Sequence, residues 1–302
     1  MQAGVVRRVR RGALGWSSAV IAVMTLVACS GDAVEVGAQA PGEPPSTTSP
    51  AELVAPPPTA PPPPTTAPPP PSTTAPAPPP SIGAVPAKGL GPGDRGPQVR
   101  ALEDRLTALR YDVISTDEIY DQNTAFAVVA FQKVSGLPRT GRATQDVVDA
   151  LVTAASPPPL VPGGGPTRIE IDLPRQVLFL YHNDALIRIL PVSTGSGQRF
   201  CDEGRCRTAV TPPGSYRIGY RVDGWDESPL GRLYKPLYYM VGAGIAIHGY
   251  ADVPPHPASK GCVRIPLAAA ETLPGQVPDD TPVFVLDGKT PAAPAPPPGT
   301  ET

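Results

Sequence analysis

The sequence has little net charge, few histidines and cysteines, and no long hydrophobic run. Its formal net charge is −2, which provides no basic face for nucleic-acid binding. Three histidines and four cysteines leave few candidates for a nucleophile, a base or a metal ligand. The apolar, uncharged run at residues 13–28 has 16 residues, whereas a membrane-spanning helix needs about 20. These absences exclude a nucleic-acid partner and make this run too short for an ordinary membrane span.

Proline, by contrast, is abundant and unevenly placed. The chain has 46 prolines, roughly three times the usual share, and 20 of them lie between Pro41 and Pro86. Residues 29–87 contain almost no aromatic or charged side chains, so they cannot bury enough apolar surface to fold. We expect a polyproline II tether that reaches up to roughly 180 Å; a docking site for proline-recognition modules is the alternative. Residues 288–302 form a second proline-rich segment, a tail.

Residues 1–28 have the features of a bacterial signal peptide. Several arginines precede an uncharged apolar run, and the run ends in Leu26-Val27-Ala28-Cys29. This ending resembles a lipobox, in which the cysteine is lipidated and becomes the new N-terminus. The resemblance implies an extracytoplasmic protein that a lipid on Cys29 anchors to the bacterial cell membrane, with its domains reaching into the cell wall. A short anchor that is never cleaved is the alternative, and it also places the folded part outside the cytoplasm.

Charged residues and helical periodicity return in residues 88–155. Apolar residues at helical spacing mark the inner face of a first helix: Val99, Leu102, Leu106 and Leu109. A second helix is expected over residues 123–134, with Asp121 or Asn123 as its cap. A third helix is expected from about Thr144. Three short helices in this span predict a small helical domain.

The order of residues in this region resembles the peptidoglycan-binding type 1 domain. The resemblance rests on residues 93–99, which open the first helix, on 125–132 within the second, and on Gly136-Leu137-Pro138 with Gly141 after it. It implies a three-helix domain that binds the cell wall. A helical spacer without a ligand is the alternative. Residues 156–165 are expected to form a linker.

From residue 166 to residue 287 the pattern changes to the period of two that is typical of β-strands. Strands are expected at 169–173, 177–181, 186–192, 214–218, 244–248 and 282–286. One helix is expected near residues 267–273. The pattern predicts a mainly β domain, a sandwich or open barrel with one helix. Together with the helical region it predicts a multidomain chain.

Two residues of this β region can carry nucleophilic chemistry. His248 ends an apolar strand, and Cys262 lies fourteen residues later within Ser259-Lys260-Gly261-Cys262-Val263-Arg264. A thiol attacks as its thiolate, so it needs a base or a positive charge beside it. Spacing alone does not distinguish such a pair from a structural cysteine and a hydrogen-bonded histidine.

The residues around this pair resemble the signature of the L,D-transpeptidase (YkuD-like) family. Ile247-His248-Gly249 is followed by residues 259–264, and two upstream segments agree with the family pattern: 192–195 with 211–216, and the opening hairpin at 169–178. One position departs from the pattern, because Lys260 stands where the family usually has a histidine directly before Gly-Cys.

The resemblance implies an enzyme that cross-links peptidoglycan without a cofactor or a metal. Cys262 would be the nucleophile and His248 its base, Ser259 would orient His248, and the backbone of Gly261 and Cys262 would form the oxyanion hole. The partners would be peptidoglycan stem peptides, a tetrapeptide donor and an amine acceptor, joined in a 3→3 cross-link through a thioester. An L,D-carboxypeptidase acting on the same stems, or a non-catalytic wall-binding lipoprotein, is the alternative.

Five residues are candidates for substrate binding. Arg264 can hold a substrate carboxylate or brace the loop. Lys260 can favour the thiolate electrostatically, but it cannot accept a hydrogen bond as an imidazole does. His256 lies among prolines and is expected in a loop or in the substrate cleft, and Gly249 and Tyr239 are expected beside the site.

The two remaining cysteines bracket four residues. In an oxidising compartment, Cys201 and Cys206 are expected to form a short disulfide loop, which the chain-entropy model values at roughly 2 kcal/mol. Two free thiols or a partial metal site are the alternatives, although no histidine or third cysteine lies close to them in the sequence.

Overall fold

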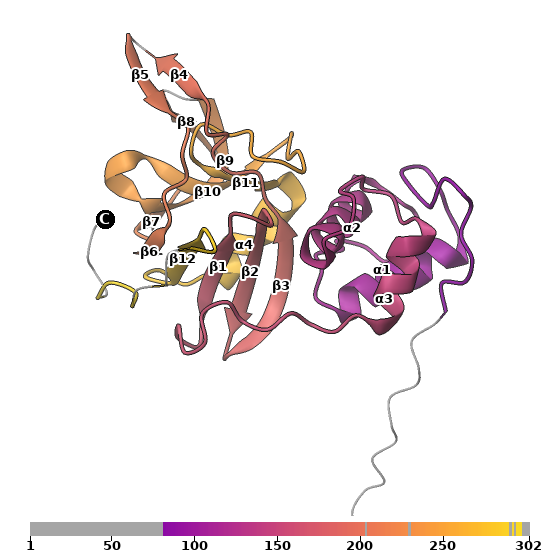
Figure 1. Ribbon diagram of the computed structural model, residues 1–302. Coiled ribbons are helices and arrows are strands. Elements are labelled where there is room, and N and C mark those ends of the chain that lie inside the picture. The colour runs from indigo at the N-terminus through magenta and orange to yellow at the C-terminus, as the bar shows by residue number, and fades with distance from the viewer. Residues whose placement is uncertain (1–80, 203, 229–230, 290–291, 293, 298–302) are drawn as a thin grey trace, which may run out of the picture. The chain divides into compact units, whose positions relative to one another are not determined.

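A computed structural model describes residues 81–302, except 203, 229–230, 290–291, 293 and 298–302. All of the described residues belong to one compact unit. The expected signal peptide, Cys29 and most of the proline-rich tether lie outside the described residues. Along the chain, a helical module is followed by a β module (Figure 1). None of the helices in the described part is long and apolar enough to cross a membrane.

The helical module contains the three helices that the periodicity predicts. They are α1 (Pro97–Ala108), α2 (Gln122–Ser135) and α3 (Gln145–Thr153). The Asp121 carboxylate caps α2 by accepting a hydrogen bond from the backbone N–H of Thr124, and Gly136 ends the helix in a left-handed conformation. Ile82 is only 6% exposed and packs in the same core. The folded module therefore begins before Lys88, where the charge pattern predicts its start.

The β module has two sheets and a separate hairpin within the described residues. The first sheet has the strand order β3-β2-β1-β12-β6, formed by β1 (Arg168–Asp172), β2 (Val177–His182), β3 (Ala185–Pro191), β6 (Gly214–Arg217) and β12 (Pro282–Leu286). The second has the order β11-β10-β9-β7, with β8 also paired to β9, formed by β7 (Tyr220–Arg221), β8 (Trp225–Ser228), β9 (Gly231–Met240), β10 (Ile245–Tyr250) and β11 (Val263–Pro266). The hairpin pairs β4 (Arg199–Asp202) with β5 (Arg205–Thr208).

The two sheets and one helix share a single apolar core. Its members include Ile169 and Leu178 of the first sheet, Ile247 and Val263 of the second, and Leu273 of α4 (Leu267–Gln276). The helix packs against β9, β10 and β11. This arrangement confirms the predicted mainly β fold with one helix and fixes the strand pair β10–β11, which carries the candidate site.

The long strand β9 is not predicted by the sequence. Pro236 interrupts it, and proline is unusual inside a paired strand because it cannot donate a ladder hydrogen bond. Lys235 has a φ of 46°, and the pairing of β9 with β10 shifts register between Ile247 and Gly249. These features are typical of a β-bulge. The bulge breaks the alternation of apolar and polar residues by which a strand is recognised.

The free edge of β3 is covered by the helical module. The backbone N–H of Asp112 donates to the carbonyl of Ile189 over 3.1 Å, and the N–H of Ile189 donates to the carbonyl of Arg110 over 2.8 Å. Arg188 forms a two-pronged ion pair with Asp112, with N–O distances of 2.8 and 2.9 Å. Phe179 of β2 belongs to the same apolar cluster as the three helices. The two modules therefore share a core rather than meeting only through a linker.

A buried lysine also joins the modules. The Lys133 side chain on α2 is 2% exposed, and its Nζ donates to the carbonyls of Gln176 and Val192, each over 2.9 Å. Burial, with a smaller contribution from Arg139, lowers the pKa of Lys133 from 10.5 to about 7. Both accepting carbonyls belong to the β module, so this one side chain forms hydrogen bonds with two backbone groups of the neighbouring module.

Replacing Lys133 with methionine is expected to destabilise the protein. The Lys133→Met side chain fills similar space but leaves the buried Val192 carbonyl without a donor, and such an unsatisfied group costs about 1–3 kcal/mol. The Gln176 carbonyl keeps the hydrogen bond from the Val192 N–H. Thermal unfolding of the full chain should show a lower midpoint. Lys88→Met, at an exposed position, is the matched control and should unfold like the original chain. Equal midpoints for the two variants would contradict the role given to Lys133.

Candidate active site

The parallel strands β10 and β11 bring His248 and Cys262 to one face of the second sheet. Ile247 pairs with Val263, and His248 pairs with Arg264. Successive side chains on a strand point to opposite faces, and Ile247 and Val263 point into the core. His248, Arg264 and Cys262, which directly precedes β11, are therefore on the other face. All three line a pocket of about 300 Å³.

The His248 ring is held in a single tautomer. The side chain is 2% exposed, and its Nδ1 lies 2.9 Å from the carbonyl oxygen of Gly249. A carbonyl oxygen only accepts hydrogen bonds, so Nδ1 carries the proton and Nε2 keeps its lone pair. Burial lowers the pKa of His248 from 6.5 to about 4; the hydrogen bond to Gly249 opposes this shift and the charge of Arg264 adds to it. At neutral pH the ring is an uncharged base.

The Cys262 thiol is also uncharged in this environment. Burial raises its pKa, while a backbone hydrogen bond with Ala246 and the charge of Arg264 act in the opposite direction. The thiol donates a long hydrogen bond to the carbonyl of Gly244, with a distance of 3.7 Å between Sγ and oxygen. A neutral thiol has to give its proton to a base before the sulfur can attack, and the uncharged His248 ring lines the same pocket.

Ser259 and Gly261 shape the turn that presents Cys262. The Ser259 hydroxyl donates to the carbonyl of Cys262 and accepts from the backbone N–H of Gly261. Gly261 has a φ of 145°, which side chains rarely adopt, and a Cβ there would lie 3.0 Å from the carbonyl oxygen of Val210. Ser259 thus fixes the turn itself. The resemblance implies that Ser259 orients His248, but none of the hydrogen bonds that the structure gives to Ser259 is with His248.

A buried hydrogen-bond network holds this turn in place. The carbonyl of Thr194 accepts from the backbone N–H of Ser259 over 2.9 Å. The Thr211 hydroxyl donates to the carbonyl of Gly261 over 2.6 Å and accepts from the N–H of Gly195 over 2.9 Å. Behind it, the amide of Gln176 donates to the Thr194 hydroxyl and accepts from the Thr194 N–H. These residues connect the Cys262 turn to the first sheet.

The residues expected to bind substrate divide into two groups. Lys260 and Arg264 line the pocket with Cys262. Tyr239 is fully buried in the core, because β9 turns it toward the first sheet. Gly249 is also buried, and a Cβ there would lie 2.7 Å from that of Ala270. The His256 side chain is exposed outside the pocket lining, and its carbonyl accepts from the Ser193 hydroxyl.

The β4–β5 hairpin reaches the pocket from outside the two sheets. Cys201 and Cys206 pair across it and form a disulfide, whereas Cys262 is a free thiol. Arg207 and Thr208 of the hairpin line the pocket. No pattern in the sequence places these residues at the site, because their position depends on tertiary structure. Thr194 and Thr211 are also missed as individual residues, although both lie in the segments 192–195 and 211–216 that carry the resemblance.

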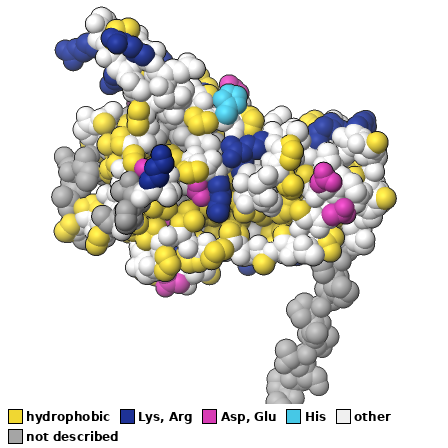
Figure 2. Space-filling view, in the orientation of Figure 1, with side chains coloured by type: hydrophobic (Ala, Val, Ile, Leu, Met, Phe, Trp, Pro, Cys, Tyr) yellow, Lys and Arg dark blue, Asp and Glu magenta, His cyan; other side chains and the backbone are white. Residues whose placement is uncertain are grey.

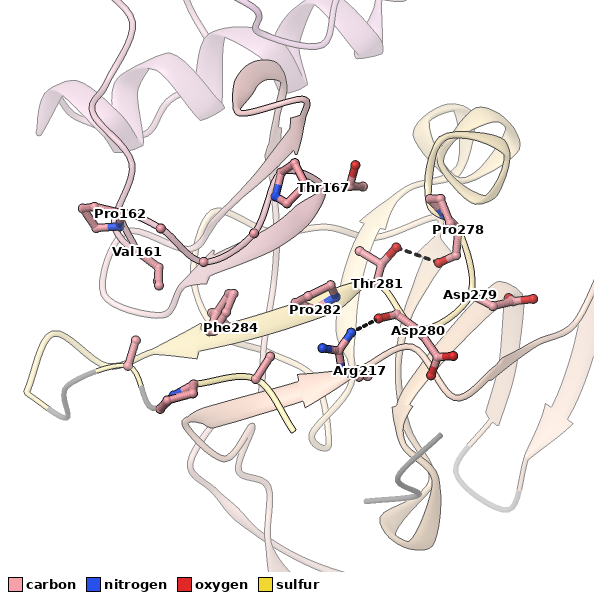
Figure 3. A pocket seen from close by; sticks show the side chains of 17 residues that line it. Val161, Pro162, Thr167, Arg217, Pro278, Asp279, Asp280, Thr281, Pro282 and Phe284 are labelled. Carbon is pink, nitrogen blue, oxygen red and sulfur yellow. Dashed lines mark hydrogen bonds between the residues drawn. The ribbon is translucent and has the colours of Figure 1, made fainter. Parts of the chain in front are cut away.

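A larger hollow lies elsewhere in the β module. It has a volume of about 690 Å³ and is lined by residues 161–167, 278–282 and part of the C-terminal segment, together with Arg217 and Phe284. Figure 3 shows the Arg217 guanidinium directed at the carbonyl of Asp280; it also donates to the carbonyl of Pro296. The hollow contains neither Cys262 nor His248. Within the described residues, no group of three or more His, Cys, Asp or Glu side chains is arranged to hold a metal.

The raised pKa of Cys262 predicts slow alkylation at neutral pH. The rate of reaction with iodoacetamide should rise with pH to a midpoint above that of an ordinary thiol, followed by mass spectrometry of the Cys262 peptide. Arg264→Gln should move the midpoint higher, because the Arg264 charge lowers the pKa of the thiol. Arg232→Gln is the control, since Arg232 lines the same pocket but pairs with Glu227. A midpoint below the ordinary value would contradict a neutral resting thiol.

Comparisons with known proteins agree with this arrangement. The L,D-transpeptidase catalytic domain (YkuD) model matches residues 166–285, and the putative peptidoglycan binding domain model matches residues 95–151. No curated protein matched the chain.

Among solved structures, an L,D-transpeptidase from Xylanimonas cellulosilytica is 34% identical and covers 66% of this chain and 98% of its own, with a TM-score of 0.62. An L,D-transpeptidase from Stackebrandtia nassauensis is 21% identical and covers 68% of this chain and 100% of its own, with a TM-score of 0.38. One from Mycobacterium tuberculosis is 15% identical and covers 40% of this chain and 58% of its own, with a TM-score of 0.35. Both are too distant in structure to add to the assignment. The chain belongs to the YkuD family of L,D-transpeptidases, with a peptidoglycan-binding-type domain preceding the catalytic domain.

Proposed function

We propose that the protein forms 3→3 cross-links in peptidoglycan by acyl transfer through Cys262. The observation that carries the proposal is the placement of Cys262 and His248 on one face of the β10–β11 pair, both lining one pocket. A base with a free Nε2 beside a thiol is the arrangement that nucleophilic catalysis needs. The preceding peptidoglycan-binding-type domain supports a substrate within the cell wall.

In the first half-reaction, Cys262 would take the acyl group from a donor stem. His248 Nε2 accepts the thiol proton as Sγ attacks the carbonyl carbon of the third residue of a tetrapeptide. The peptide bond to the terminal D-alanine breaks, and its nitrogen takes the proton from the imidazolium and leaves as a free amine. The third residue is then held on Cys262 as a thioester.

In the second half-reaction, an amine would release the acyl group. The side-chain amine of a second stem attacks the thioester carbonyl and gives up a proton to His248, which returns it to the departing sulfur. The new amide bond is the cross-link. Water attacking the same thioester would instead give a trimmed tripeptide, which is the carboxypeptidase outcome.

The tetrahedral intermediate would need a donor for its oxyanion. The backbone N–H of Gly261 is already committed to the Ser259 hydroxyl, with a distance of 3.0 Å between nitrogen and oxygen. This leaves the N–H of Cys262 as our candidate, with Ser259 and Gly261 as residues that position it. Their part in catalysis is therefore to hold the turn.

We further propose that the folded modules work outside the cell, attached through Cys29. The lipobox-like ending at residues 26–29 and the proline-rich segment that follows it support a lipid anchor and a long tether. Such a tether would let the catalytic pocket reach stem peptides at a distance from the membrane.

Cys262→Ala is expected to abolish product formation. The full chain is incubated with disaccharide-tetrapeptide, and the products are analysed by mass spectrometry together with any covalent adduct on Cys262. Cross-linked dimer supports the proposal, and tripeptide alone identifies a carboxypeptidase. No product and no adduct would support a non-catalytic wall-binding protein and sink the proposal, as would full activity in Cys262→Ala. His182→Ala, at the exposed end of β2, is the matched control and should retain full activity.

The low pKa of His248 predicts activity well into the acid range. His248 must be neutral to accept the thiol proton, and its pKa is lowered to about 4. The acid limb of kcat/KM, which reports the free enzyme, should therefore fall through its half-maximum near pH 4 rather than near 6.5. Arg264→Gln should move this limb upward, because the Arg264 charge helps to depress the pKa of His248. An acid limb near 6.5 would contradict the lowered pKa of His248.

A further inference from the structure

The charged side chains that line the pocket around Cys262 are all positive. No Asp or Glu of the described residues lines it. Its four cationic side chains are Arg207, Arg232, Lys260 and Arg264. The whole chain, in contrast, has a formal net charge of −2. The positive charge is therefore a local property of this pocket and not of the protein as a whole.

Three of these cations lie against aromatic rings instead of carboxylates. The Arg207 guanidinium carbon and Lys260 Nζ lie 5.1 and 5.6 Å from the centroid of the same Phe200 ring, and the Arg264 guanidinium carbon lies 4.2 Å from that of Tyr250. An aromatic ring holds a cationic head in place without neutralising its charge. Within the described residues, none of the three forms a salt bridge.

The fourth cation provides an internal comparison. Arg232 lies over Trp225 but also pairs with Glu227, at 2.7 Å between nitrogen and oxygen. Of all four, only Arg264 contributes to the pKa shifts of Cys262 and His248. Among the described residues, Arg207 and Lys260 have no carboxylate partner, which leaves their charges available to a ligand.

The hairpin that carries Arg207 is built to hold it at the pocket. Arg207 lies directly across the strand pair from Phe200, and the Cys201–Cys206 disulfide closes the next pair along. Figure 2 shows Lys and Arg side chains gathered on this hairpin, at the top left of the view. The Lys260 head, from the Cys262 turn, meets the hairpin at Phe200. The Phe200 ring thus contacts both Arg207 of the hairpin and Lys260 of the Cys262 turn.

We infer that this pocket selects acidic donor stems, with Arg207 and Lys260 binding carboxylates of the peptide other than the one at its terminus. The inference rests on the proposed function and adds the chemical class of its donor. Ionised carboxylates bring an opposite charge and two acceptor oxygens to guanidinium and ammonium groups. A carboxamide in their place accepts through one oxygen only and brings no charge, so it binds these cations more weakly. A stem whose acidic residues carry free carboxylates is bound in preference to one in which they are amidated.

The test compares two donors that differ only in charge. Disaccharide-tetrapeptide with free carboxylates and its counterpart with internal carboxamides are given to the full chain, and kcat and KM are measured for each. The original chain should use the carboxylate donor about tenfold better in kcat/KM. Arg207→Gln and Lys260→Gln should remove most of this preference by raising KM for the carboxylate donor alone, and Lys260→Arg should keep it. Arg205→Gln is the matched control, on the same hairpin but outside the pocket lining.

A measurement on the unaltered chain guards against variants that fail to fold. Raising the ionic strength should lower kcat/KM more steeply for the carboxylate donor than for the carboxamide donor, which keeps only its terminal carboxylate, because salt screens charges exposed to solvent. Equal use of the two donors by the original chain, or an equal salt response, would overturn the inference and leave the proposed function standing. No product from either donor and no adduct on Cys262 would instead overturn the proposed function.

Discussion

The position of Cys262 depends on hydrogen bonds from a neighbouring segment. The turn at residues 258–262 belongs to neither a helix nor a strand. It is fixed from one side by the carbonyl of Thr194, which accepts two backbone N–H groups of the turn, and from the other by the Thr211 hydroxyl. Both threonines are almost fully buried, where an unmade hydrogen bond is costly. The geometry of Cys262 is thus set by these buried polar groups, and Gly261, with a φ of 145°, provides the backbone conformation that the turn requires.

The same network extends to the helical module. The Gln176 side chain binds Thr194, and the Gln176 carbonyl accepts from Lys133 of α2. A neutral amine still has two N–H donors, which is the number that its two accepting carbonyls need. The connection is therefore compatible with either protonation state of Lys133, whose pKa of about 7 lies near neutrality. The peptidoglycan-binding-type domain is in this way a structural support for the Cys262 turn.

Periodic segments could be predicted from the sequence, and positions set by tertiary contacts could not. The three helices and β1–β3 follow their apolar patterns, and the local motif picks out His248 and Cys262. Lys133 could not be found, because a lysine in an amphipathic helix predicts a solvated side chain unless its buried acceptors are known. Arg207 could not be predicted for a similar reason, because nothing in the sequence of a short, charged hairpin indicates which pocket the hairpin reaches. Ser259 was singled out by the motif, but its role follows from the turn geometry, which only the structure provides.

The charge states of the reacting pair and of the pocket fit one another. A resting thiolate would repel an incoming carboxylate. Burial instead keeps Cys262 and His248 neutral, so the positive charge of the pocket remains available while an acidic peptide approaches. In the mechanism that we propose, the thiolate forms only as the proton passes to His248, when the sulfur is already next to the carbonyl carbon of the substrate. On this view the raised pKa of the Cys262 thiol is no obstacle to catalysis. The pocket first binds the negative charge of the substrate carboxylate, and the negative charge of the thiolate forms only afterwards.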